Sequence, residues 1–278
     1  MTAQIVRSKW LDTPALTPLV STLLDHASIV EGLDYVDDRG MVDSFNCLDT
    51  VVPTTFCPDA PEEKDFEAPH WIDGIRFAVY GGISCKPFGF SEERGLAKIT
   101  EVFKAKESVG VERALMESRF IDGPDDDPGA GVDLRWPAAT DLTPGAGAVA
   151  PEVGLAILEG HAGSIYAGVP TIHAPRTIGS LLASDDAIVV TAGKAYSKLG
   201  SKVAIGSGYE YPNNGPTGAA PAAGTLWMYA TGEVFLARSP QVAVKTMDTV
   251  NNDIYALAER AYVAAIDCYA AAVRVTVA

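Results

Sequence analysis

The glycine-rich segment "GAGAVA" at 145–150 is the first candidate for chemistry, because glycines at such spacing let a backbone approach a bound dinucleotide. Its residues Gly145, Gly147 and Ala150 match the loose form of the dinucleotide-binding pattern. That pattern requires a preceding apolar strand, whereas a Thr-Pro pair stands at 143–144. The segment therefore favours a flexible loop over a nucleotide site.

Nucleophile and phosphate-binding motifs lack their supporting glycines. Neither Ser164 nor Ser207 has glycines at both flanking second positions, as the sharp turn of a nucleophile elbow requires. Gly193-Lys194 lacks the earlier glycine of a Walker loop and is followed by Ala195. No catalytic residue and no cofactor is therefore predicted.

Candidate metal ligands are dispersed. The chain has four histidines without paired-ligand spacing: His26, His70, His161 and His173. Hydrogen-bonded or surface histidines are favoured over ligands. The acidic run at 125–127, with Asp133, could attract a divalent cation, but it does not follow the calcium-loop pattern. A solvated acidic loop is favoured there, and no metal site is predicted.

The formal net charge of −15 narrows the function classes, since a field of that sign repels nucleic-acid phosphates. A DNA-reading module is disfavoured, while a wall around enclosed DNA is compatible with this charge. The four cysteines form no CxxC pair and follow no secretory signal, so reduced thiols made in a cytoplasm are expected. No targeting segment is seen at Met1–Trp10, and no run approaches the ~20 apolar residues of a membrane span.

The first ~120 residues are predicted to form arms and one solitary helix, and the last ~130 a compact α/β body. A short helix is expected within 11–36. Strands at Val51–Phe56 and Trp71–Gly82 are expected to form a long hairpin with an acidic tip at 58–69. Because a two-stranded hairpin is marginal alone, a neighbouring subunit is expected to support it.

The longest helix is predicted from Ser91, a plausible N-cap, to about Phe120. Leu96, Ile99, Val102 and Phe103 supply its apolar stripe, and Glu107 is expected on the solvent face with Glu101, Lys104 and Lys106. A long Asp/Pro/Gly connection follows at Ile121–Ala150.

The second half alternates between helical and extended patterns. Helices are expected from Pro151 to about Tyr166, at Arg176–Ser184, and from Asn251, where Ile254, Leu257, Ala258 and Ala261 share a face. Strands are expected at 170–175, Ala187–Thr191, Lys202–Ile205, Thr225–Ala230, Glu233–Arg238, Gln241–Thr246 and Cys268–Val277. The two strands on either side of Thr231-Gly232 are expected to be joined by a tight turn.

Four stretches of the chain resemble capsid subunits of actinobacteriophages, which have the Hong Kong 97 fold. They are "EVFKAKESVGVERALM" at 101–116, "GLAILEGHAGSIYAGVPTIHAPR" at 154–176, "GSKVAIGSGYEYPNNGPTG" with the following "GTLWMYATGEVFLARS", and "NNDIYALAERAYVAAIDCYAAAVRV" at 251–275. The order of arm, hairpin, long helix and α/β body resembles that family as well. The resemblance covers nearly the whole chain.

The resemblance implies an α+β fold of the Hong Kong 97 type with four regions. They are an N-terminal arm at 1–45, an extended hairpin loop at 46–90, a peripheral domain with a spine helix at 91–121 and 240–278, and an axial α/β domain at 122–239. By the same resemblance, the extended loop lies over a neighbouring subunit, and axial loops such as Tyr209–Gly224 meet at five-fold and six-fold centres.

The resemblance also raises two questions about processing. Some members carry an N-terminal scaffolding segment that is removed, whereas this sequence begins with arm-like residues, so a separate scaffold is expected. Other members crosslink a loop lysine to an asparagine with help from a glutamate. Lys64, Asn251 or Asn252, and Glu259 are residues of those types, although ordinary solvated or interface roles are favoured for them.

The function that the resemblance implies is that of a non-enzymatic major capsid protein, found in the virion and made in the host cytoplasm. Its expected partners are copies of itself in hexamers and pentamers, with separate scaffolding, portal and decoration proteins, around double-stranded DNA that it does not bind sequence-specifically; no membrane partner is expected. An encapsulin-type shell around protein cargo, a cytoplasmic α/β enzyme, and a phage tail or decoration protein remain alternatives.

Overall fold

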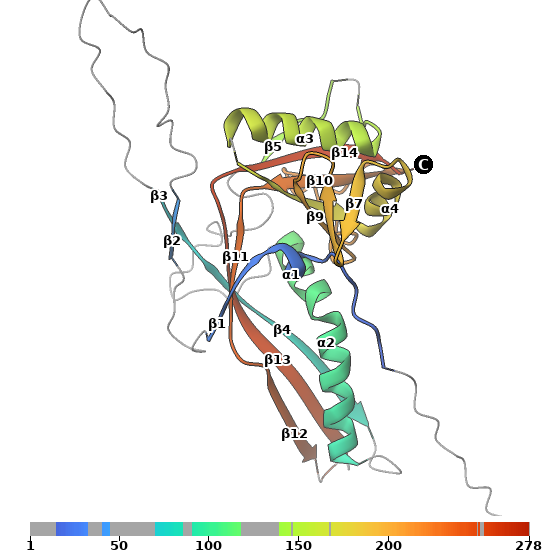
Figure 1. The fold of residues 1–278 in the computed structure, drawn as a ribbon. Helices are drawn as coiled ribbons and strands as arrows, with labels where there is room; N and C mark the ends of the chain where they lie inside the picture. Colours follow the sequence, from blue (N-terminus) through green and yellow to red (C-terminus); the bar gives the residue numbers. More distant parts are fainter. Residues whose placement is uncertain are drawn as a thin grey trace, which may run out of the picture.

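The computed structural model describes residues 15–32, 41–44, 70–85, 91–117, 139–145, 147–166, 168–248, 250 and 253–277. Within these ranges, two large β-sheets are joined by one long helix. The chain also crosses between the two sheets twice, from β10 to β11 and from β13 to β14 (Figure 1). A separate pair of short antiparallel strands, β2 (Met41–Ser44) and β3 (His70–Asp73), stands beside them.

The first sheet, here called the spine sheet, is built around one long strand. Its members are β1 (Ser28–Glu31), β4 (Ile75–Cys85), β11 (Val234–Arg238), β12 (Val242–Asp248) and β13 (Asp253–Ile266). Strand β13 pairs antiparallel with β11 and β12 along one edge and with β4 along the other. Strand β1 extends the sheet by pairing in parallel with β11.

The spine helix α2 (Glu92–Glu117) lies along this sheet (Figure 1). Its length of 26 residues corresponds to about 39 Å at the usual rise per residue. Ile99 and Phe103 pack on Ala256 and Ala258 of β13. The predicted N-cap is confirmed, since the Ser91 hydroxyl accepts the backbone N–H of Arg94 at 3.2 Å.

The second sheet, here called the axial sheet, has seven strands in the order β5-β14-β10-β6-β9-β8-β7. Their bounds are β5 (Thr140–Asp141), β6 (Thr171–Pro175), β7 (Ile188–Thr191), β8 (Lys194–Ser197), β9 (Lys202–Gly206), β10 (Thr225–Thr231) and β14 (Ala270–Thr276). Helices α3 (Pro151–Ile165) and α4 (Arg176–Ser184) match the predicted ones, and they cover one face.

Alternation along β10 explains why the axial sheet is buried on both faces. Met228 and Ala230 face the cluster formed with α3 and α4. Trp227 and Tyr229 face a second cluster, which contains Leu115 of α2 and other residues of α2 and of the short helix α1 (Leu23–His26). The last turns of the spine helix therefore belong to the core of the axial sheet.

The helix predicted from Asn251 is wrong, because residues 253–266 form β13. Ile254, Leu257, Ala258 and Ala261 have helical spacing, but burial alternates along the first half of the strand, where Ile254, Ala256 and Ala258 are buried. Partners along both edges of β13 fix its backbone, and this pairing overrides the helix propensity of an alanine-rich segment.

The tight turn predicted at Thr231-Gly232 does not join two paired strands. Strand β10 lies in the axial sheet and β11 in the spine sheet, so the chain crosses between sheets here. Strand β13 crosses back into β14 at the same place, where Gly232 N–H donates to the Tyr269 carbonyl and Asp267 N–H to the Glu233 carbonyl, both at 2.9 Å. The two crossings form one antiparallel ribbon that passes through both sheets.

The predicted hairpin is also revised. Its first strand, Val51–Phe56, lies outside the described residues. Its second strand is divided into β3, which pairs with β2, and β4, which pairs with β13 over eleven positions. Strand β8 was not predicted, and the helical pattern within 11–36 gives only α1 before the chain enters β1.

Candidate functional site at the spine helix

The spine helix is held to its surroundings by Glu112, which is fully buried. Its carboxylate accepts the backbone N–H of Leu23, at the start of α1, at 3.2 Å. It also accepts the N–H of Gly208, just after β9, at 3.0 Å. Burial raises the pKa of Glu112 to about 7, and the two N–H donors oppose that rise.

Two glycines allow β9 to approach the helix this closely. A Cβ atom on Gly206 would lie 2.3 Å from the carboxyl carbon of Glu112. A Cβ atom on Gly208 would lie 2.5 Å from both the Glu112 Cβ and the Val109 carbonyl oxygen. Glycine is therefore required at both 206 and 208 for β9 and the following loop to pack against α2. The Gly-Ser-Gly spacing is the feature of the sequence that indicates this close contact. We call Leu23, Glu112, Gly206 and Gly208 the Glu112 junction.

Two of the predicted structural histidines lie close to this junction. His173 on β6 pairs through Nδ1 with the Tyr209 hydroxyl at 3.0 Å and through Nε2 with the Thr231 hydroxyl at 2.8 Å. Burial lowers the pKa of His173 to about 3. Burial, followed by the charge of Lys194, lowers the pKa of His26 to about 4. Both rings are therefore neutral at pH 7 and are held by protein groups.

The other chemical candidates are separated in the structure. His161 and the Tyr269 hydroxyl are 3.1 Å apart, and the Ser164 hydroxyl donates to the His161 carbonyl. In the glycine-rich segment, Gly147 N–H closes a turn on Pro144, and Val149 bridges to β14. Within the described ranges, no three His, Cys, Asp or Glu side chains are grouped to hold a metal ion.

The crosslinking candidates are only partly described. Glu259 lies on β13, in register with Val242 on one side and Tyr80 on the other. Lys64, Asn251 and Asn252 lie outside the described residues, as do His70's side chain, the acidic run at 125–127 and Asp133. Crosslinking therefore stays a prediction.

The expectation of four reduced thiols is wrong for Cys268, which is disulfide-bonded in the structure. The expectation rests on a cytoplasmic site of synthesis and on the lack of a CxxC pair. Neither feature indicates which cysteines the fold brings close together in space. The side chains of Cys47, Cys57 and Cys85 lie outside the described residues.

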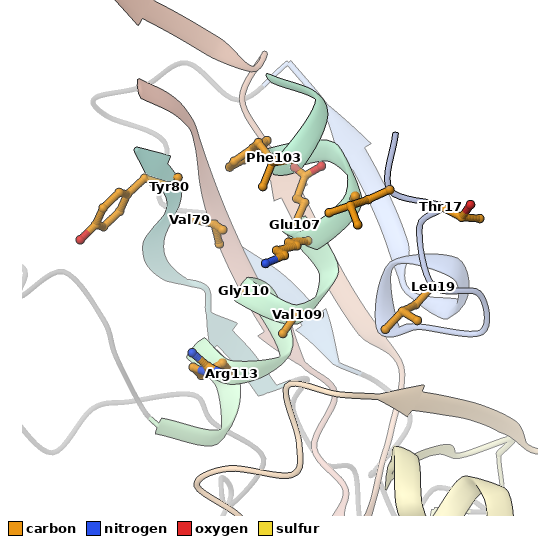
Figure 2. A pocket seen from close by; sticks show the side chains of 14 residues that line it. Thr17, Leu19, Val79, Tyr80, Phe103, Glu107, Val109, Gly110 and Arg113 are labelled. Carbon is orange, nitrogen blue, oxygen red and sulfur yellow. The ribbon is translucent and has the colours of Figure 1, made fainter. Parts of the chain in front are cut away.

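A groove of about 510 Å³ runs beside the spine helix, between α2, β4 and the arm segment that precedes α1 (Figure 2). Apolar residues form most of its wall, among them Leu16, Leu19, Val79, Val102 and Phe103. Gly110 lets the helix approach β4, because a Cβ atom there would lie 2.4 Å from a Val79 methyl. Tyr80, 73% exposed, stands at the rim (Figure 2).

The charged residues that line this groove come from the helix. Lys106 and Arg113 are exposed along it. Glu107, predicted to face solvent, is instead 8% exposed. It accepts from Arg260 Nη1 at 2.8 Å and from the Tyr262 hydroxyl at 2.5 Å. Both partners lie on β13, the segment for which the sequence predicts a helix, so the sequence does not indicate this contact.

A second apolar surface lies at the far end of the spine sheet. Val242, Val244 and Met247 of β12 are each 37–49% exposed, and so is Tyr255 of β13 at 41%. Strand β12 pairs on one side only among the described strands. A free strand edge with apolar neighbours is typical of a surface that another chain covers.

None of the described helices is long and apolar enough to cross a membrane.

Comparison with solved structures identifies the fold. A structure from Mycobacterium phage Ogopogo aligns over 99% of this chain and 97% of its own, with 12% identity and a TM-score of 0.55. The capsid of an empty GTA particle aligns over 95% and 100%, with 13% identity and a TM-score of 0.51. The capsid of Ralstonia phage GP4 aligns over 97% and 95%, with 9% identity and a TM-score of 0.51.

The chain has the Hong Kong 97-type capsid fold. The predicted fold class is confirmed by these alignments, which extend over nearly the full length of both chains in each pair. No protein-family model and no curated protein sequence matches the chain.

Proposed function

We propose that this chain is the major capsid protein of a tailed phage, which assembles as hexamers and pentamers into an icosahedral shell around double-stranded DNA. The observation that carries the proposal is the capsid fold itself, matched end to end with solved phage and GTA capsids. The net charge of −15 supports a container wall, because a surface of that sign does not adhere to packaged DNA.

The protein is proposed to act structurally rather than as an enzyme. The polar side chains of the Glu112 junction and its neighbours are buried and bonded to protein groups, so they leave no open reaction site there. Separate scaffolding, portal and decoration proteins are proposed partners. The proposed location is the virion, after synthesis in the host cytoplasm.

The proposed regions follow the predicted division, with adjustments suggested by sheet membership. Strand β14 pairs with β10 and β5, so we assign residues 270–277 to the axial domain. Strand β11 pairs with β13 and β1, so we assign 234–239 to the peripheral domain. Strand β4 pairs with β13 over its whole length, so we assign 75–85 to the peripheral domain as well. The arm is proposed at 1–45 as predicted, and the extended loop at 46–74.

The groove beside the spine helix is the proposed binding site for the extended loop of a neighbouring subunit. The tip of that loop, at 58–69, carries five acidic residues and one lysine around Phe66. The groove offers an apolar wall with Lys106 and Arg113 along it. Opposite charges with an aromatic anchor between them are complementary features of such a contact.

Negative-stain electron microscopy of the purified chain tests the main proposal, alone and after co-expression with candidate scaffold genes. Closed shells or capsomer rings are expected. A uniform monomer or small dimer in every condition would reject the shell and favour a cytoplasmic α/β enzyme. Nuclease-protected DNA in shells formed in the presence of the packaging genes separates a phage capsid from an encapsulin, which would enclose protein cargo instead.

A further inference from the structure

The disulfide-bonded Cys268 lies where the chain crosses from the spine sheet to the axial sheet. It stands between Ile266, the last residue of β13, and Ala270, the first residue of β14. Its two neighbours in sequence, Asp267 and Tyr269, are hydrogen-bonded through their backbones to the other strand of the ribbon. The disulfide therefore joins a fixed point at the crossing to another segment of the chain.

The register of the spine sheet excludes Cys85 as the partner of Cys268. Cys85 pairs with Ile254, close to the first residue of β13, whereas Cys268 follows the last one. Strand β13 has 14 residues, which at about 3.3 Å per residue extend roughly 40 Å. The Cα atoms of a disulfide lie no more than about 7 Å apart. Because the chain has four cysteines, the partner is Cys47 or Cys57.

The described strands bring the start of the extended loop to the same end of β13 as Cys268. Strand β4 begins beside Ala264 of β13, and β3 comes directly before β4. Strand β2 pairs with β3, so that Ser44 lies beside the backbone of His70. Cys47 follows Ser44 by three residues, a span of at most about 10 Å. A bond from Cys57 would require ten further residues to be ordered, at a greater cost in conformational entropy.

We propose that Cys268 is bonded to Cys47, which fixes the first residues of the extended loop at 46–74 to the crossing between the two sheets of the same subunit. The bond closes a covalent ring that contains the spine helix and strands of both sheets. A crosslink between segments so distant in sequence stabilises the fold chiefly by restricting the unfolded chain. It also limits the directions in which the loop leaves its own subunit.

Formation of the bond requires an oxidant, because a chain made in a cytoplasm carries thiols. A low-molecular-weight disulfide such as oxidised glutathione supplies it by exchange. One protein thiolate attacks this disulfide and displaces one glutathione thiolate, and the second protein thiolate attacks the mixed disulfide and displaces the other. Two protein thiols are thereby oxidised to one disulfide, while one molecule of oxidised glutathione is reduced to two of glutathione, which take up the two protons.

Peptide mapping of the full chain tests the pairing. The protein is treated with oxidised glutathione, its remaining thiols are alkylated, and the chain is cleaved after Asp and Glu, which separates all four cysteines. A linked pair of peptides that contain Cys47 and Cys268 is expected in the mass spectrum, and reduction should remove it. A link from Cys268 to Cys57 or Cys85, or a free thiol at Cys268, overturns the proposal.

Isotope labelling distinguishes a bond within one subunit from a bond between two. Subunits grown on ¹⁵N are mixed with unlabelled subunits before oxidation. Linked peptides that are both labelled or both unlabelled are expected, and pairs of mixed composition overturn the proposal. The mapping works on dissociated subunits as well as on shells, so the disulfide and the capsid proposal can fail separately.

Cys47→Ser and Cys85→Ser form a matched pair for the effect on stability. The urea midpoint of oxidised wild type and of oxidised Cys85→Ser is expected to fall by roughly 1–2 M on reduction. The midpoint of Cys47→Ser should not change on reduction, because Cys268 then has no partner. Equal shifts in the two variants, or no shift in wild type, overturn the proposal. If Cys47→Ser does not fold, the peptide map of wild type decides alone.

Discussion

At the scale of single residues, the contacts that join the arm, the spine helix and the axial sheet depend on the absence of side chains as much as on their presence. Gly208 faces the backbone of α2, where the Val109 carbonyl would lie 2.5 Å from an added Cβ. Gly163 on α3 is the opposite case, because a Cβ there meets nothing within 4 Å. These two glycines form a matched pair for measuring the cost of the close approach.

Gly208→Ala is expected to lower the free energy of unfolding by roughly 1–3 kcal/mol, because the helix must move away from the β9 loop. Gly163→Ala is expected to raise it by roughly 0.5–1 kcal/mol, because alanine is the better helix former in an open position. Urea unfolding of the dissociated subunits measures both. Equal effects of the two substitutions would show that the close approach carries no strain.

His26 is expected to make the fold sensitive to acid. Its pKa is lowered from 6.5 to about 4, so the stability tied to the neutral ring is lost as the pH falls from about 6.5 towards 4. In His26→Gln, the loss of unfolding free energy between pH 7 and 4.5 should be smaller than in wild type by roughly 2 kcal/mol. Chemical unfolding at several pH values checks this, and parallel curves for the two proteins would contradict it.

At the scale of elements, the exposed cations of the spine helix are expected to matter for assembly. Lys106→Glu with Arg113→Glu should prevent or strongly slow shell formation, because the groove would then repel the acidic tip at 58–69. Lys104→Glu is the control, since Lys104 is exposed on the same helix but does not line this groove. Light scattering and electron microscopy follow assembly, and circular dichroism verifies folding.

Equal assembly of the double variant and the control would contradict the groove as a docking site.

The salt dependence of assembly shows whether a defect in the double variant is electrostatic. If raising the salt concentration to about 1 M restores assembly of the double variant, the defect is electrostatic, because exposed charges are screened at that ionic strength. A defect that salt does not change would point to altered packing around Arg113.

Local patterns were sufficient to predict the elements whose partners are close in sequence or whose caps are explicit. Ser91 and Pro151 marked the starts of α2 and α3, and Arg176–Ser184 was found at its full length. Segments defined by distant partners were not predictable in this way. Strand β13 has helical spacing and becomes a strand only because β4, β11 and β12 pair with it.

The candidate site was less predictable than the fold for the same reason. Glu107 and Glu112 look like solvated helix residues until Arg260 and the Leu23 and Gly208 amides are brought to them from distant segments. The glycines at 206 and 208 were the available sequence signal, and they indicate a close approach without naming its partner. Local patterns do not determine how distant segments pair. The overall fold was instead implied by the resemblance to phage capsid subunits.

At the scale of the whole molecule, the ribbon of β10–β11 and β13–β14 is the covalent and hydrogen-bonded link between the two sheets, alongside the spine helix. Its two strands cross together and are bonded to each other at the crossing through Gly232 and Asp267. The Tyr166 hydroxyl of the axial side donates to the Asp267 carboxylate at 2.9 Å and so braces the bend.

This arrangement has a mechanical consequence. Tension that draws the two sheets apart is carried along the backbones of the two crossing strands, and it loads in shear the hydrogen bonds that tie these strands to their neighbours within each sheet. Strands pulled perpendicular to their length would instead unzip one bond at a time at much lower force. A wall made of such subunits would therefore resist stretching from within while still bending at the crossing, where only a few bonds hold its angle.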